Sequence, residues 1–256
     1  MRTQYDDIGQ SYERLKREMP LAKGPERATV EALTGAALTG GTPAGGTPAG
    51  GAAGGSVLDL ACGTGWYSRI IARAGAASVL GVDISEEMVA AAERAEAREP
   101  LGIRYKVHDA RTLGVIGRFD LVNAVWLLCY ARDRSDLAAM ARTIHDNLAP
   151  GGVYTGLEMN PRFDWAGPKA TKYGLTHRPD ADFPGGKELT VTAHVDPPIS
   201  FQACFWEEEP VVTALREAGF RSVELVPAVL TADQAADPFW DDFRANPPIV
   251  GIRAVK

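Results

Sequence analysis

The stretch VLDLACGTGWYSRIIARAG, residues 57–75, sets the fold of this chain. Apolar residues on both sides of Asp59 are typical of a buried strand, which we place at residues 56–61. The small residues of Ala61–Gly65 predict a tight turn that leads into a helix at 66–74. Free backbone N–H groups at the start of such a helix suit a carboxylate or a phosphate. On its own, a Gly-rich turn of this kind also occurs in dinucleotide-binding enzymes.

A second acidic residue follows at the spacing that an adenosine ligand requires. VLGVDIS, residues 79–85, reads as the next strand and ends in Asp83, about 20 residues after the turn. A carboxylate at this position accepts hydrogen bonds from both ribose hydroxyls. The alternative is that Asp83 and Ser85 only cap the following helix.

The chain beyond these motifs alternates regularly between strands and helices. The expected strands are 56–61, 78–83, 103–108, 119–127 and 153–158, and the expected helices are 66–74, 86–98 and 135–148. Strands separated by helices of this length indicate βαβ units and a mostly parallel sheet. The sequence therefore predicts an α/β fold, and 256 residues are enough for a single domain of this type.

Three segments depart from this alternation. Residues 10–33 predict a helical cap with a break near Pro20 and Gly24. Residues 34–55 carry a tandem GGTPA repeat, which predicts a flexible Gly-rich insert. Residues 160–198 are rich in Pro, Gly and Asp, and we interpret them as an irregular segment that covers the substrate. A strand at 199–206, a helix at 210–218, a strand at 221–226 and an apolar run at 249–255 complete the chain.

Composition excludes several classes of function. The formal net charge is -6 and no basic stripe is present, so neither DNA nor RNA is expected as a partner. Cys62, Cys129 and Cys204 are too widely spaced to predict a disulfide framework or a zinc site, and no metal is expected. The N-terminus has no apolar signal region and no stretch reaches the roughly 20 apolar residues that span a bilayer. We expect a cytoplasmic protein without membrane contact, either a monomer or a homodimer.

These motifs resemble those of class I S-adenosylmethionine-dependent methyltransferases. Asp59-x-Ala-x-Gly-x-Gly followed by Asp83 is similar to the first two motifs of that family, rather than to the GxGxxG of dehydrogenases. His108-Asp109-Ala110, the run Phe119–Ala124 and Leu148–Gly152 resemble the later motifs. The resemblance implies a Rossmann-like sheet of seven strands with helices on both faces, the last strand antiparallel, and S-adenosylmethionine as the cofactor.

The resemblance also implies where the cofactor binds. Asp83 would hold the ribose, Asp109 the adenine amino group, and the turn backbone the carboxylate end. Tyr5 and Tyr12 are candidate caps, since aromatic faces favour a sulfonium cation, although packing within an amphipathic helix also explains them. Arg27 either pairs with the carboxylate or is a solvated helix residue. The full expected set is Tyr5, Tyr12, Arg27, Asp59, Ala61, Cys62, Gly63, Gly65, Asp83, Ile84, Met88, Asp109, Ala110, Asn123 and Ala124.

Further motifs resemble a subgroup of this family. Tyr5-Asp6-x-Ile8-Gly9, Trp126-Leu127-x-x-Tyr130, Lys172-Tyr173-Gly174, Asp196-Pro197-Pro198 and Phe239-Trp240-Asp241 are similar to motifs of the bacterial N-methyltransferases that make the azapteridine toxoflavin. That subgroup resembles enzymes that methylate indole carbons. The resemblance implies N- or C-methylation of a small heteroaromatic molecule in a natural-product pathway that makes an antibiotic or an alkaloid.

Aromatic residues and histidines supply the candidate acceptor site. Six aromatic residues could either stack against a flat acceptor or pack in the core: Trp126, Tyr130, Trp165, Tyr173, Phe201 and Trp206. If the acceptor must lose a proton, His177, His194 or Asp182 is a candidate base, and Tyr173 is a further catalytic candidate. A loop histidine can equally be only exposed to solvent.

Two rival functions stay open at this point, and so does a protein, in place of a small molecule, as the methyl acceptor. An NAD-dependent reductase shares the Gly-rich turn and the ribose acid, but the turn here is Ala-Cys-Gly-Thr-Gly and no Tyr-x-x-x-Lys follows residues 119–127. A non-catalytic subunit that binds S-adenosylmethionine would keep the fold without the activity. Complete cofactor motifs and the aromatic-rich segment disfavour this second alternative.

Overall fold

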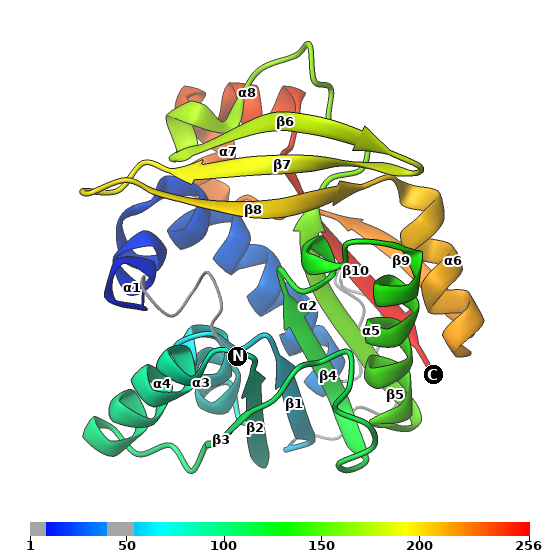
Figure 1. Cartoon of the computed structure of the whole chain (residues 1–256). Coiled ribbons are helices and arrows are strands. Elements are labelled where there is room, and N and C mark those ends of the chain that lie inside the picture. The colour runs from blue at the N-terminus through cyan, green and yellow to red at the C-terminus, as the bar shows by residue number, and fades with distance from the viewer. Residues whose placement is uncertain (1–8, 40–53) are drawn as a thin grey trace.

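The computed structural model describes residues 9–39 and 54–256, with the side chains of residues 9–11 left out. Its main sheet has seven strands in the order β3-β2-β1-β4-β5-β10-β9, and a second sheet has three strands in the order β6-β7-β8 (Figure 1). β10 runs antiparallel to both of its neighbours, whereas β1 to β5 are parallel. The predicted Rossmann-like sheet with an antiparallel last strand is confirmed.

The elements follow the predicted alternation closely. The strands of the main sheet are β1 (Ser56–Leu60), β2 (Ser78–Asp83), β3 (Arg104–Val107), β4 (Phe119–Val125), β5 (Leu148–Met159), β9 (Ser222–Pro227) and β10 (Ile249–Val255). The helices are α1 (Gly9–Glu18), α2 (Arg27–Thr39), α3 (Trp66–Arg73), α4 (Glu86–Arg98), α5 (Arg134–Asp146), α6 (Glu208–Ala218), α7 (Ala232–Ala236) and α8 (Asp241–Ala245).

Strand β4 lies in the interior of the main sheet and divides the core into two faces. Val122 and Ala124 point to the face that α5 and α6 cover, whereas Leu121 and Val125 point to the opposite face. Alternate residues of a strand point to opposite sides, so a strand buried on both sides is apolar along most of its length. This explains why the run 119–127 reads as continuously apolar rather than as alternating.

The N-terminal helices cover one face of the sheet, and the second of them extends into the segment that was predicted to be a flexible insert. A π-helical turn (Ala22–Glu26) with a kink at Gly24 joins α1 to α2, as the Pro-Gly break predicts. α2 continues to Thr39, six residues into the predicted flexible insert, because Leu38 is buried against β1 and α3. Residues 40–53 of the insert lie outside the described residues.

The prediction of an irregular segment at 160–198 is wrong. Most of this stretch forms a β-hairpin of β6 (Leu175–Phe183) and β7 (Gly186–Ala193), and β8 (Ile199–Trp206) extends it. Together the three strands lie across the carboxyl ends of β4 and β5, where they form a roof above the main sheet (Figure 1). β7 alternates buried Leu189, Val191 and Ala193 with more exposed residues, because only its lower face packs on the protein.

An aromatic cluster joins the roof to the C-terminal segment. The Tyr173 ring stacks on the Trp240 ring with centroids 4.9 Å apart, and Phe239 and Phe243 meet it edge-on. The Tyr173 hydroxyl donates to the Phe239 carbonyl at 3.1 Å and accepts from the Phe243 N–H at 2.8 Å. Tyr173 is 1% exposed, so these bonds satisfy a hydroxyl that water does not reach.

No helix in the two described ranges is long and apolar enough to cross a membrane.

We predict that the Tyr173 hydroxyl stabilises the fold. Tyr173→Phe leaves the buried Phe243 N–H without its partner, so the free energy of unfolding should fall by about 1–3 kcal/mol. Tyr154→Phe is the matched control, because the Tyr154 hydroxyl is buried with no hydrogen-bond partner among the described residues. Urea denaturation measures both. Equal stabilities of the two variants would contradict this role for Tyr173.

Candidate functional site

Two adjoining cavities lie between the main sheet and the roof. The larger is a cleft of about 1880 Å³, open to solvent, at the carboxyl ends of β1, β2 and β4. The smaller, of about 550 Å³, lies between α1 and the roof. Residues that line both are Tyr12, Trp126, Cys129, Tyr130 and Ala203. Ligands of α/β sheets bind beyond the carboxyl ends of the strands, so the larger cavity, here called the cofactor cleft, is where the motifs place a cofactor.

Asp83 lines the cofactor cleft at the end of β2. Its Oδ2 accepts a hydrogen bond from the Gly63 N–H at 2.8 Å, and its Oδ1 accepts one from the Ser85 N–H at 2.9 Å. These two bonds fix the orientation of the carboxylate. Ser85 itself caps α4 by accepting from the Met88 N–H. The capping role therefore belongs to Ser85, and Asp83 faces the cleft.

The Gly-rich turn lets an aromatic ring approach its backbone. A Cβ atom at Gly63 would lie 3.4 Å from Cε1 of the Tyr12 ring, which places that ring beside the turn. Gly63 and Gly65 both have left-handed φ angles, +55° and +78°, which favour glycine. The ring of Tyr12, the turn and the Asp83 carboxylate thus form a cradle of the kind that fits an adenosyl sulfonium compound, with an aromatic face for a cation and an acid for a diol.

Asp59 lies beneath the cofactor cleft rather than in its wall. Its carboxylate accepts from Ser68 Oγ at 2.6 Å and from Asn123 Nδ2 at 2.7 Å, and Thr155 Oγ1 donates to Asn123 Oδ1 at 3.1 Å. Burial raises the pKa of Asp59 to about 6, against the opposing effect of these hydrogen bonds. The network joins the ends of β1, β4 and β5 and so shapes the floor of the cleft.

Asp109 is placed at the cleft wall but is engaged in an ion pair. Arg111 contacts its carboxylate at 2.6 Å and reaches Asp136 of α5 at 3.3 Å. Burial alone would raise the pKa of Asp109, but the hydrogen bonds from Arg111 lower it below its usual value. Asp109 is therefore a carboxylate at neutral pH.

The structure brings together only part of the predicted cofactor set. The predicted residues that line the cleft are Tyr12, Ala61, Gly63, Asp83, Ile84, Met88, Asp109 and Ala110. Its lining does not include Asp59, Cys62, Gly65, Asn123 or Ala124. Arg27 lies in a separate surface groove and pairs with Glu31 at 2.7 Å. Tyr5 lies outside the described residues.

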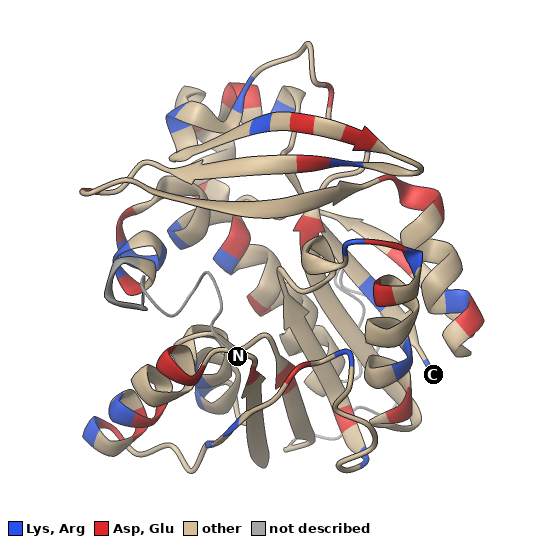
Figure 2. Cartoon of the chain, in the orientation of Figure 1, with Lys and Arg blue, Asp and Glu red and all other residues tan. Residues whose placement is uncertain are grey.

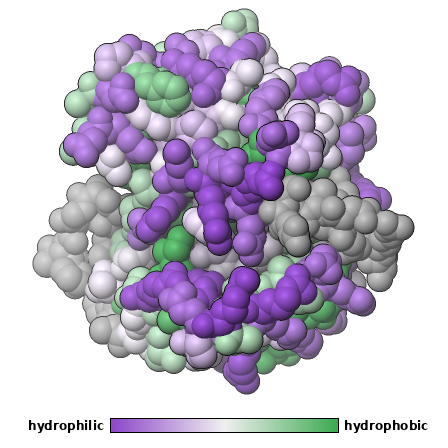
Figure 3. Space-filling view, turned by 90° about the vertical axis from the view of Figure 1, so that its left-hand side faces the viewer, coloured by the Kyte–Doolittle hydropathy of each residue, from purple (hydrophilic) through white to green (hydrophobic). Residues whose placement is uncertain are grey.

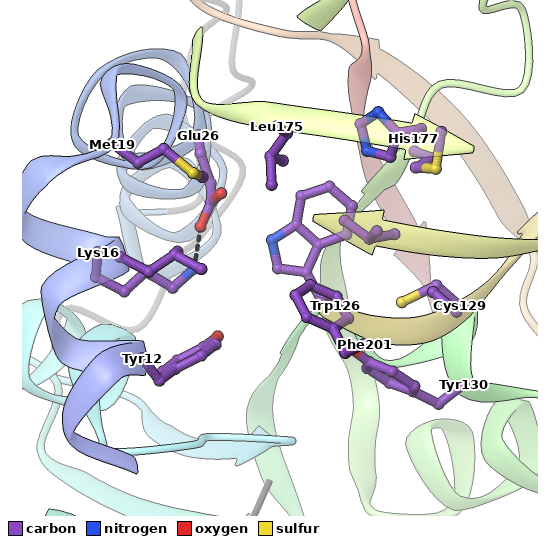
Figure 4. Close-up of a pocket in the computed structure, with 14 residues that line it drawn as sticks. Tyr12, Lys16, Met19, Glu26, Trp126, Cys129, Tyr130, Leu175, His177 and Phe201 are labelled. Carbon is purple, nitrogen blue, oxygen red and sulfur yellow. Dashed lines mark hydrogen bonds and ion pairs between the residues drawn. The ribbon is translucent and has the colours of Figure 1, made fainter. Parts of the chain in front are cut away.

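The smaller cavity has an aromatic wall and is here called the acceptor pocket. Trp126, Tyr130 and Phe201 of the predicted set line it, together with the apolar side chains of Leu15, Met19, Met159, Leu175 and Val191 (Figure 4). Trp126 has a positive φ of 59°, a conformation that bulky residues adopt only where the surroundings impose it. Its N–H donates to the Leu157 carbonyl at 2.9 Å, which helps to hold it there.

A buried carboxylate supports the segment that carries Trp126. Glu158, at the end of β5, accepts from the Leu128 N–H at 2.6 Å and from the Cys129 N–H at 3.2 Å. Burial raises the pKa of Glu158 to about 7. Burial also raises the pKa of the Cys129 and Cys62 thiols, so neither cysteine is a thiolate nucleophile at neutral pH.

Three predicted acceptor-site aromatics lie elsewhere. Trp165 packs edge-on against Phe163 and Phe205, and Trp206 donates to the Ala131 carbonyl at 3.1 Å. Tyr173 belongs to the aromatic cluster with Trp240. Core packing accounts for all three, because each finds apolar partners or a backbone hydrogen bond away from both cavities.

The candidate bases also separate in space. His177 of β6 lines the acceptor pocket. Exposed His194 bonds Thr176 at 2.7 Å, and exposed Asp182 pairs with Lys187. His194 follows the end of β7, and Asp182 lies beside the turn of the hairpin beyond a bulge in β6, so neither lines the pocket.

Sequence reasoning missed two charged residues of the acceptor pocket. Lys16 of α1 and Glu26 of the π-helical turn are buried, form an ion pair and line the pocket (Figure 4). Lys16 follows Tyr12 by four residues and so lies on the same helix face, which is the signal that the sequence offers. On the roof side, Glu188 and Gln202 line the cofactor cleft and were also missed.

The outer surface seen in Figures 2 and 3 is mainly polar and charged. Acidic and basic residues alternate along the helices and the roof (Figure 2). The face on the left of Figure 1 is mainly hydrophilic, with small apolar areas (Figure 3). The apolar lining of the acceptor pocket is therefore not part of a large apolar patch on that face.

Comparisons with known proteins agree with this geometry. Residues 57–152 match the family model described as a methyltransferase domain. The chain is 28% identical over 170 residues to N-demethylindolmycin N-methyltransferase of Streptomyces griseus, covering 65% of this chain and 70% of that protein. It is 33% identical over 114 residues to a ubiquinone biosynthesis O-methyltransferase of Pseudomonas aeruginosa, covering 43% of this chain and only 47% of that relative.

A solved methyltransferase structure has a similar fold. The S-adenosylmethionine-dependent methyltransferase of Mesorhizobium loti superposes with a TM-score of 0.56 at 26% identity, covering 79% of this chain and 91% of that one. The family motifs lie at the cleft that the sheet topology predicts, and the sheet has the seven strands and the antiparallel strand that the resemblance implies. Residues 57–152 thus match the methyltransferase-domain family, and the chain has the fold of class I S-adenosylmethionine-dependent methyltransferases.

Proposed function

We propose that the protein transfers a methyl group from S-adenosylmethionine to a nitrogen or carbon atom of a small heteroaromatic molecule in natural-product biosynthesis. The observation that carries this proposal is the pairing of the two cavities. A cleft lined by Asp83 adjoins a small aromatic pocket, and Tyr12, Trp126 and Tyr130 line both. The Streptomyces griseus relative, named for N-methylation of demethylindolmycin, supports the acceptor class.

The residues of the chain are proposed to act mainly by positioning. S-adenosylmethionine supplies an activated methyl group, so no protein nucleophile or metal ion needs to form a bond to it. Asp83 would hold the ribose, the Tyr12 ring would cover the turn, and Trp126 would separate the two ligands. Holding donor and acceptor in reactive geometry contributes roughly 7–11 kcal/mol in well-oriented reactions.

His177 is proposed to orient the acceptor as a neutral imidazole. Burial lowers the pKa of His177 to about 4, so the ring carries no charge at neutral pH. A base with so low a pKa is a poor proton acceptor, but a neutral ring still offers both a donor and an acceptor nitrogen.

The test of the proposed function is product analysis. The protein is incubated with S-adenosylmethionine and a panel of azapteridines, indole amines, Trp-containing cyclic dipeptides and phenols, and products are identified by mass spectrometry. A gain of one methyl group on a nitrogen or carbon of a heteroaromatic compound is expected. Methylation of the phenols alone would contradict the acceptor class.

Asp83→Ala is expected to weaken binding of S-adenosylhomocysteine by about 10- to 150-fold. The reason is a net loss of about one hydrogen bond from the ribose to a charged acceptor, worth about 1.5–3 kcal/mol. Calorimetry measures the dissociation constant. Glu87→Gln, on an exposed face of α4 where Glu87 pairs with Arg94, is the control that should bind normally. A normal dissociation constant for Asp83→Ala would refute the ribose assignment.

Phe201→Leu is expected to raise KM for the methylated panel compound about two- to tenfold, because aromatic contacts contribute roughly 0.5–1.5 kcal/mol beyond burial. The affinity for S-adenosylhomocysteine should be unchanged, since Phe201 lines only the acceptor pocket. Steady-state kinetics and calorimetry measure the two constants. An unchanged KM would place the acceptor elsewhere.

His177 predicts a pH dependence of stability. Its pKa is lower in the folded chain than the ordinary value of 6.5, so the unfolded chain binds more protons between pH 6.5 and about 4. The contribution of His177 is therefore fully present above pH 6.5 and is lost as the pH falls through this range. Urea denaturation at pH 8 and pH 5 should show wild type losing more stability than His177→Gln. Parallel losses would contradict the buried neutral ring.

A further inference from the structure

The acceptor pocket holds a buried ion pair at one end. Lys16 and Glu26 form it, and both side chains are only 2% exposed. Taking two charges out of water is costly unless their remaining polar atoms also find partners. How each atom of this pair is satisfied therefore decides what the pocket offers to a ligand.

The ammonium group of Lys16 contacts one carboxylate and lies near two aromatic rings. It donates to Glu26 Oε1, and its Nζ lies 5.4 Å from the ring centroid of Tyr12 and 5.0 Å from that of Tyr67. Burial alone would lower the pKa of Lys16, but the adjacent Glu26 carboxylate raises it above the ordinary value. Lys16 is a cation whose donors face Glu26 and two aromatic rings.

The Glu26 carboxylate is satisfied on one side only. Its Oε1 accepts from both Lys16 and the Tyr67 hydroxyl, the latter at 2.7 Å. Among residues 12–39 and 54–256, no hydrogen bond reaches its Oε2. The carboxylate stands at the pocket, with its second oxygen directed toward the cavity rather than toward Lys16 (Figure 4).

We infer that Glu26 binds an N–H group of the methyl acceptor through Oε2, so that the pocket selects flat heteroaromatics that carry an N–H donor. A ligand that presents only a lone pair or a sulfur atom at this place leaves a buried, charged oxygen without a partner. Sites that hydrogen-bond a ligand reject the analogue lacking that group more strongly than apolar pockets reject a size change. This inference rests on the proposed function, because it assumes that the acceptor occupies this pocket.

The wild-type test compares two probes of the same shape. Indole carries an N–H donor, and benzothiophene has sulfur in its place. Calorimetry with the S-adenosylhomocysteine-loaded protein should give indole at least tenfold tighter binding. Equal binding, tighter binding of benzothiophene, or no binding of either probe would overturn the inference.

The variant test removes both charges together. Glu26→Leu removes the acceptor oxygens, but alone it leaves a buried ammonium without its counter-ion and endangers folding, so it is combined with Lys16→Met. The preference for indole should fall to within twofold, while the dissociation constant of S-adenosylhomocysteine stays within threefold. The matched control combines Glu13→Leu with Arg17→Met, an ion pair on the same helix that does not line the acceptor pocket, and should keep the preference.

Two outcomes separate this inference from the proposed function. A preference that survives in the Lys16→Met/Glu26→Leu variant, or a tenfold loss of S-adenosylhomocysteine affinity there, would overturn the inference even if the panel is methylated. A preference that depends on Glu26, with no methylation of any heteroaromatic compound, would support the N–H site and refute the proposed reaction.

Discussion

The buried carboxylate of Asp59 is the interaction on which the cofactor cleft depends. It takes one hydrogen bond from α3 through Ser68 and one from β4 through Asn123, which is bonded in turn to Thr155 of β5. A buried acid with a pKa of about 6 is tolerated only because these donors surround it. The network fixes the ends of the central strands and the start of α3, and the turn between them can then present its backbone to a ligand.

The three-stranded roof partly closes the crevice at the carboxyl ends of the main-sheet strands. Parallel strands leave an open crevice at their carboxyl ends, and the β6-β7-β8 sheet and α1 close part of it. This arrangement yields a polar cleft and an apolar pocket that share Tyr12, Trp126 and Tyr130. The shared residues form the contact zone between donor and acceptor in the proposed reaction. Two buried glutamates have different partners: Glu26 pairs with Lys16, and Glu158 accepts from backbone N–H groups.

The main sheet was predictable because its signals are local. The apolar runs ending in Asp59 and Asp83, with a Gly-rich turn between them, specify two strand ends and their shared edge. The roof hairpin was missed for a physical reason. β6 contains Pro179 and three exposed acidic or basic residues on its outer face, so its composition is that of a loop, and only its pairing with β7 makes it a strand. β7 did carry a period-two signal in Leu189, Val191 and Ala193.

The site residues that could be predicted from the sequence are likewise those that local motifs place. Residues on the strand-end motifs, such as Asp83 and Asp109, were found from the sequence because short-range geometry places them. Lys16 and Glu26 were not, because a lysine and a glutamate ten residues apart look like solvated helix charges until tertiary packing buries them. Trp165, Trp206 and Tyr173 were assigned to the pocket on residue type alone, and long-range packing decides between pocket and core for such residues.

The central claim is that the cofactor occupies the strand-end cleft and the acceptor the aromatic pocket beside it. A crystal structure with S-adenosylhomocysteine tests it most directly. The account predicts the ribose hydroxyls within hydrogen-bond distance of Asp83 and the sulfur at the opening between Tyr12 and Trp126. A ribose remote from Asp83, or a sulfur that faces away from that opening, would contradict it.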